Sequence, residues 1–112
     1  MALKHFCMRE IIMIIVNGRF QTTNENIVGI KNAIATMEKS SRLEDGCNDF
    51  TFSVELNDTR VLRITECWDN MEALEAHFSS PHMAEFRKSL ATLPAEGRDV
   101  HFYEVIQEVR RP

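Results

Sequence analysis

The segment ITECWDNMEALEAHFSSPHMAEF, from Ile64 to Phe86, contains the signals of one strand and two helices in succession. Glu66 and Trp68 fall two positions apart, which places both side chains on one face of a strand. The apolar spacing then becomes helical, until Ser80 and Pro81 supply an N-cap and a first helical residue for a second helix. The segment therefore predicts a strand that leads into a pair of helices.

Each helix of this pair has one apolar side. Asp69, with Glu72 three residues later, is placed to cap the first helix. The residues expected to be buried are Met71, Leu74 and Phe78 in the first helix and Met83, Phe86, Leu90 and Leu93 in the second.

Three further strands are predicted outside this segment. Arg9 to Val16 contains IIMIIV, which is β-branched and apolar on both faces. Phe50 to Leu56 alternates apolar and polar residues, and a turn at Asn57 to Thr59 joins it to the return strand, Val61 to Trp68. After PAEGRD, Val100 to Val109 has the pattern of a last strand.

One helix is predicted between the first two strands. Thr22 and Glu25 match a capping box, and the helix is predicted to end near Ser41, before a turn at Glu44 to Gly46. Its apolar residues follow one stripe, formed by Ile27, Ile30, Ile34 and Met37.

This order of elements predicts an α+β fold of the ferredoxin-like type, βαββαβ with an antiparallel sheet. Helices on one face of four strands leave the other face open. Because the strand Arg9 to Val16 is apolar on both faces, we expect the open face to pack against the sheet of a second copy in a homodimer. At 112 residues we expect one domain, 1–112, with Met1 to Met8 as a flexible lead-in.

Composition and charge argue against several classes of partner. With 44% apolar and 27% charged residues the chain has the composition of a globular domain, and a net charge of −4 without a basic run argues against nucleic acid. The longest apolar run, Ile11 to Val16, is too short to span a membrane, and Met1 to Glu10 has no signal-peptide pattern. Three cysteines without CxxC spacing favour reduced thiols in a cytoplasmic protein.

In this order, the local motifs resemble the antibiotic biosynthesis monooxygenase family, and within it the quinol-monooxygenase-like subgroup. The shared pattern is Glu-x-Gly-Cys before the second strand, Glu-x-Trp at the end of the third, and then Ala-Leu-x-x-His and Ser-Pro-His. In this chain these residues are Glu44, Gly46 and Cys47; Glu66 and Trp68; Ala73, Leu74 and His77; and Ser80, Pro81 and His82. The resemblance spans Ile11 to Leu90, most of the chain.

The resemblance implies a ferredoxin-like domain that dimerises through its sheets into an α+β barrel. It also implies that dioxygen oxidises a quinol or an electron-rich phenol without flavin, haem or metal, while the protein deprotonates and positions the substrate. The sequence agrees in having neither a dinucleotide-binding glycine motif nor an obvious metal motif. The expected partners are therefore a small aromatic or quinol substrate and dioxygen, with no cofactor.

Two histidines of the motif set are candidates for the site. His77 is the expected catalytic base, since an imidazole pKa of about 6.5 suits proton transfer near neutral pH. The structural alternative is a partly buried histidine bonded to the backbone. His82 is expected mainly to pack the helix junction, with substrate binding as its functional role. Because a proline break separates the histidines, we expect their side chains to diverge and predict no metal site, even with Glu66 as a third ligand.

Five more residues are predicted to contact the substrate. Trp68 would stack on it, and Glu66, a carboxylate in line with apolar residues, needs a partner or a raised pKa. Asn17, just past the first strand, and Arg87 would orient oxygen and hold a phenolate charge, and Tyr103 is a further polar candidate. The competing interpretations are core packing for Trp68, a structural salt bridge for Glu66, and solvation for Asn17 and Arg87.

Two other functions stay open on this sequence. One is an oxygen-independent isomerase or degradative enzyme for a small signalling metabolite, as in a relative within the same family. The other is a non-catalytic, ligand-binding dimer that keeps the fold. An apolar cavity reached by His77 and Trp68 would favour chemistry, whereas full packing of both side chains would favour the non-catalytic module.

Overall fold

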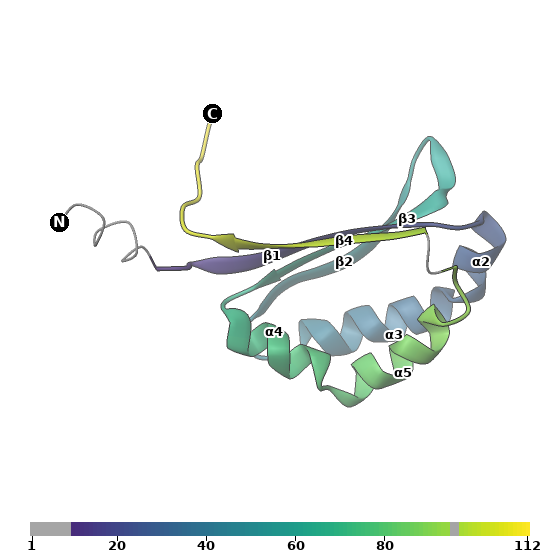
Figure 1. Cartoon of the computed structure of the whole chain (residues 1–112), viewed down its shortest axis with the longest axis horizontal. Coiled ribbons are helices and arrows are strands. Elements are labelled where there is room, and N and C mark those ends of the chain that lie inside the picture. Colours follow the sequence, from purple (N-terminus) through teal and green to yellow (C-terminus); the bar gives the residue numbers. More distant parts are fainter. Residues whose placement is uncertain (1–9, 95–96) are drawn as a thin grey trace.

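The computed structural model describes residues 10–94 and 97–112, and within them it confirms the predicted ferredoxin-like α+β fold (Figure 1). The strands are β1 (Met13–Gln21), β2 (Cys47–Glu55), β3 (Asp58–Trp68) and β4 (Arg98–Val105). The helices are α2 (Asn24–Gly29), α3 (Lys31–Arg42), α4 (Met71–Phe78) and α5 (Pro81–Leu90). The lead-in predicted for Met1 to Met8 lies outside the described residues.

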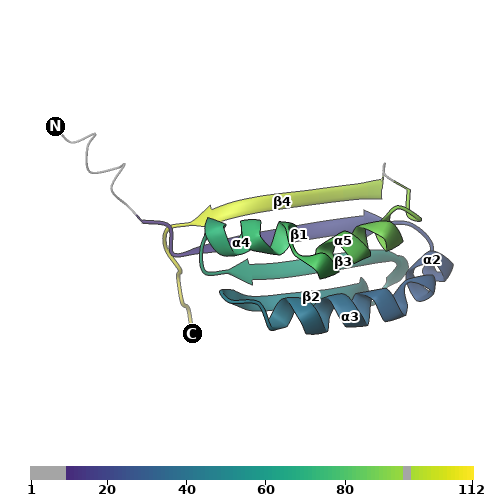
Figure 2. The same cartoon turned by 90° about the horizontal axis from the view of Figure 1, so that it is seen from below.

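The four strands form one antiparallel sheet in the order β2-β3-β1-β4, with all the helices on one face. Figure 2 shows α3 along β2 and the α4–α5 pair across the middle of the sheet, with β4 at the edge. Nearly every residue of β4 is accordingly exposed. No helix in the described part of the chain is long and apolar enough to cross a membrane.

β1 begins and ends later than the predicted strand 9–16. Residues 17–20 remain extended because each pairs with β3 on one side and β4 on the other. Gly18 lies at the tightest point of this ladder, since a Cβ there would come within 2.5 Å of the Ile64 side chain. Asn17 is therefore inside the strand rather than just past it.

Two of the predicted helix caps are displaced by one residue. Thr23, not Thr22, caps α2, and Asn70, not Asp69, caps α4, each accepting a hydrogen bond from the amide three residues on. The Ser80 cap of α5 is confirmed, with Pro81 at the first helical position. The single helix predicted after β1 is broken into α2 and α3 around Ile30, whose backbone leaves the helical region.

The core lies between the helix layer and the inner face of the sheet. Its fully buried large side chains include Ile14, Val16, Phe50, Leu62, Trp68 and Leu74. Met71, predicted to be buried, is exposed, and His77 takes its place on the buried side of α4 together with Leu74. The inner face of the sheet thus meets an imidazole as well as apolar groups.

Candidate active site

His77 and His82 meet at one carboxylate. Oε2 of Glu44 lies 2.6 Å from Nδ1 of His77 and 2.8 Å from Nε2 of His82, and the centres of the two rings are 5.9 Å apart. The prediction that the two side chains diverge is therefore wrong. The helix junction around Ser80 and Pro81 redirects the chain, so that the last turn of α4 and the first turn of α5 face the same residue.

Glu44 is held in place by a turn that is fixed at both ends. Gly46 adopts a positive φ of 81°, a conformation that glycine tolerates without strain. The Gly46 carbonyl accepts a hydrogen bond from the amide of Asp69 at 2.8 Å, which fixes the turn to the end of β3. The sequence predicted this turn and included Glu44 in the family motif, but assigned the carboxylate no role.

His77 is almost completely buried, with 1% of its surface exposed. Its ring packs against Trp68 at 4.8 Å and Phe50 at 5.2 Å between centres. Burial lowers the pKa of His77, although the Glu44 carboxylate opposes the shift, and this favours the neutral ring. Because a carboxylate can only accept, Nδ1 carries the proton and Nε2 is the ring atom that can accept another.

His77 lines a cavity of about 230 Å³ between the helices and the sheet. The other residues that line it are mainly aromatic or aliphatic, among them Phe50, Phe52, Phe78, Met83, Phe86 and Phe102. Its ionisable side chains are His77, Glu66 and Arg98. An apolar cavity of about 150 Å³ holds a benzene molecule, so this one has room for one or two aromatic rings.

Glu66 is a buried carboxyl group in the same cavity wall. The indole Nε1 of Trp68 donates a hydrogen bond of 2.9 Å to Oε1 of Glu66. Burial raises the pKa of Glu66 to about 7, with a smaller contribution from the nearby charge of Glu44, and the Trp68 bond opposes the rise. The group can therefore donate or accept a proton near neutral pH.

Trp68 contacts two residues of the cavity wall without lining the cavity itself. Its side chain is completely buried and does not line the cavity, but it contacts both His77 and Glu66. From the sequence we expected a catalytic site if His77 and Trp68 both reached a cavity, and a non-catalytic module if both were packed. The structure lies between these cases, since His77 reaches a cavity and Trp68 is packed.

The other predicted contacts lie away from this cavity. Asn17 is exposed on the face of the sheet opposite the helices, between Thr65 and His101. Tyr103 is half exposed on the same face and stacks on His101. Arg87 is exposed on α5 and donates to the Phe78 carbonyl at 3.0 Å, which ties the two helices together.

Arg98 is a cavity residue that the sequence did not indicate. It was placed in the loop before the last strand, whereas it is the first residue of β4 and pairs with Phe20. Its guanidinium donates to the carbonyls of Leu90 and Leu93 at the end of α5. The predicted strands ended at Val16 and began at Val100, so the pairing of Arg98 with Phe20 could not be expected from them.

The ligand atoms of Glu44, His77 and His82 lie within 4.8 Å of one another, a grouping that could hold a metal ion. Ligands about 2.1 Å from a tetrahedral ion would be roughly 3.4 Å apart. The two distances to the Glu44 oxygen, 2.6 and 2.8 Å, are instead those of hydrogen bonds. The geometry fits a carboxylate bonded to two imidazoles better than a metal centre.

A family model described as antibiotic biosynthesis monooxygenase matches residues 13–89. An uncharacterized protein of Synechocystis sp. is 28% identical over 72 residues, 64% of this chain and 49% of that protein, so the chain spans about half the length of this relative. A solved structure from Deinococcus radiodurans with the same family description has a TM-score of 0.79 at 23% identity, covering 88% of this chain and 98% of that one. A structure from Mycobacterium tuberculosis has a TM-score of 0.76 at 21% identity, covering 88% and 99%. At these identities the structural likeness concerns the fold.

Proposed function

Because the chain belongs to the antibiotic biosynthesis monooxygenase family, we propose that it is a monooxygenase that oxidises a quinol or an electron-rich phenol with dioxygen, without flavin, haem or metal. The observation that carries the proposal is the Glu44–His77 pair at the wall of an apolar cavity. A neutral imidazole oriented by a carboxylate is a general base, and the cavity suits a substrate of one or two aromatic rings.

In the proposed reaction, Nε2 of His77 takes the proton of a substrate hydroxyl. Glu44 stabilises the imidazolium that forms, while Nδ1 keeps its proton. The protonated form of Glu66 donates a hydrogen bond to a second substrate oxygen. With a quinol, one atom of dioxygen enters the ring and the other leaves as water. The products are a hydroxyquinone and water, so the substrate supplies all four electrons.

Oxygen consumption with a panel of one- and two-ring quinols tests this function. Protein treated with a chelator, and shown by elemental analysis to contain no stoichiometric Zn, Fe, Mn or Cu, is expected to consume oxygen faster than autoxidation does. The physical reason is that deprotonation in the cavity produces the electron-rich anion that reduces dioxygen. Activity that disappears with the metal and returns on its addition would contradict the metal-free mechanism and favour a centre at Glu44, His77 and His82.

Two other functions for the same cavity give different results in this assay. An oxygen-independent isomerase or degradative enzyme would turn over its substrate under nitrogen. A ligand-binding module would bind a quinone analogue without any turnover. The full packing of Trp68 is the observation that favours the module, and the access of His77 to the cavity favours chemistry.

We also propose a cytoplasmic homodimer formed through the outer sheet face, on which Ile15 and Tyr103 leave apolar surface uncovered. The free thiols of Cys47 and Cys67 support the location. Light scattering at micromolar concentration is expected to give twice the 13.0 kDa mass of the chain. Ile15→Glu should shift this mass to that of a monomer, because it would bury a charge in the interface, whereas Glu72→Gln on the exposed side of α4 should leave it unchanged. A wild-type monomer at this concentration would contradict the proposal.

A further inference from the structure

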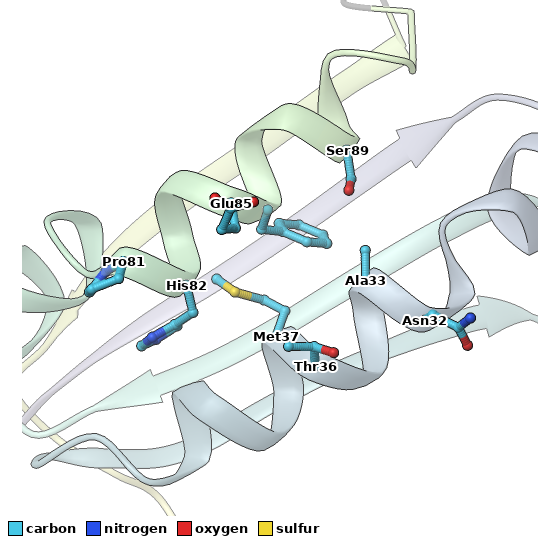
Figure 3. Close-up of a pocket in the computed structure, with 9 residues that line it drawn as sticks. Asn32, Ala33, Thr36, Met37, Pro81, His82, Glu85 and Ser89 are labelled. Carbon is cyan, nitrogen blue, oxygen red and sulfur yellow. The ribbon is translucent and has the colours of Figure 1, made fainter.

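A second cavity, a groove of about 480 Å³, lies between α3 and α5. Figure 3 shows side chains from both helices around this groove, with His82 at the end where Pro81 begins α5. Met37 and Phe86 supply its apolar lining, and Glu85 lies on its α5 side. The groove differs from the cavity that His77 lines, although Met37 and Phe86 contribute to both.

Three side chains connect the groove to the cavity. The exposed fraction falls from 20% for the His82 side chain to 16% for Glu44 and 1% for His77. The connection runs from Nε2 of His82 to Oε2 of Glu44 and from there to Nδ1 of His77. His82 is therefore the member of this series that the groove exposes to small solutes.

The Glu44 carboxylate depends on this arrangement for its position. It lies on a surface turn, and the structure gives it two hydrogen-bond donors, one on each histidine. Without the His82 bond, the partly exposed carboxylate would be free to turn toward water, which solvates it well. Nδ1 of His77 would then lack its acceptor, and the ring could place its proton on Nε2 instead.

We propose that His82 is a positioning residue, whose Nε2–H holds Glu44 where it accepts the Nδ1 proton of His77 and so keeps Nε2 of His77 available to a substrate. The inference rests on the proposed function in giving His77 the role of base. It replaces the predicted role of His82 in substrate binding, since His82 lines the groove and not the cavity of His77.

A matched pair of amide variants tests this role. Gln places its amide nitrogen near the position of histidine Nε2, whereas Asn is one methylene shorter and does not reach Glu44. His82→Gln is expected to keep most of the wild-type kcat. His82→Asn is expected to lower kcat by about tenfold to a hundredfold, with KM little changed, by analogy with the losses caused by replacing residues that orient metal-bound imidazoles. Glu85→Gln, in the same groove, should leave both constants unchanged.

Chemical rescue gives a second arm of the experiment. His82→Ala removes the ring and leaves an opening from the groove to Glu44, large enough for free imidazole. Added imidazole is expected to restore a substantial part of the lost kcat in His82→Ala and none in His77→Gln. Rescue of neither variant, together with equal kcat in the Gln and Asn variants, would overturn the proposal.

A readout that needs no turnover separates this inference from the proposed function. Nitrogen-15 spectra of the histidine rings at pH 8 are expected to show His77 protonated at Nδ1 in the wild type and in His82→Gln. In His82→Asn the spectra should show a mixture of tautomers or the Nε2-protonated ring. The same His77 tautomer in both variants would overturn the role of His82. The expected tautomer change in a protein that oxidises no quinol would support that role and remove the proposed function alone.

Discussion

Replacing His77 by Gln is expected to lower kcat for quinol oxidation by about 10²- to 10⁴-fold, the usual contribution of a general base. Glutamine places its amide near the position of Nε2 of His77, but the amide cannot take up a proton at neutral pH. Because the substrate would still fill the same apolar cavity, KM should change much less than kcat. Steady-state oxygen uptake over a range of quinol concentrations measures both constants.

The matched control for this variant is His101→Gln. His101 is an exposed histidine on the outer sheet face, paired with Asp99 at 2.7 Å, and the sheet separates its side chain from the cavity. Its replacement should leave kcat unchanged, and circular dichroism should show that both variants fold. A kcat for His77→Gln within twofold of the wild type would show that the base lies elsewhere, and Glu66 would then be the next candidate.

The fold was predictable because local patterns and their order agree. Alternation in β2 and β3, the helical stripes and the Ser80-Pro81 junction each indicate one element, and together they leave few arrangements of the sheet. The displaced caps were not predictable, because neighbouring residues such as Thr22 and Thr23 have nearly the same capping ability.

The candidate site was predictable only in part, for two physical reasons. Asn17 was assigned to the pocket because the strand was expected to end before it. Since β1 continues and side chains alternate, Asn17 faces away from the buried Val16 and from the helices. Glu44 was missed because its bonds reach across 33 and 38 residues of sequence, which no local pattern records.

The structure shows which of two expectations for Glu66 holds. The alternation in β3 placed a carboxyl group on the apolar face, which indicated either an ion pair or a raised pKa. The structure favours the raised pKa, because the side chain that bonds Glu66 is the neutral indole of Trp68 and burial raises the pKa of the carboxyl group. A buried carboxyl group that forms no ion pair within residues 10–94 and 97–112 makes the stability of the fold depend on pH.

Glu66→Gln is expected to stabilise the protein above pH 7. The pKa of Glu66 rises from an ordinary 4.5 to about 7 on folding, so the folded chain keeps a proton that the unfolded chain releases between these values. The stabilising contribution of this proton is complete below about pH 4.5 and is lost as the pH rises through 7. The loss amounts to about 3 kcal/mol, a large part of the ~5–15 kcal/mol that stabilises a typical domain.

Urea unfolding of the wild type and of Glu66→Gln at pH 5 and pH 8 measures this effect. The introduced glutamine can still accept the Trp68 hydrogen bond but carries no ionisable proton, so the stability advantage of the variant should increase toward pH 8 by up to about 3 kcal/mol. His77 titrates in the opposite sense, since its lowered pKa makes the fold lose stability as the pH falls, but both proteins contain it and its contribution cancels in the difference. Glu72→Gln, on the exposed side of α4, should show no such increase. An equal difference at both pH values would mean that Glu66 is ionised in the folded protein, and it could not then donate the hydrogen bond to the substrate that the proposed reaction requires.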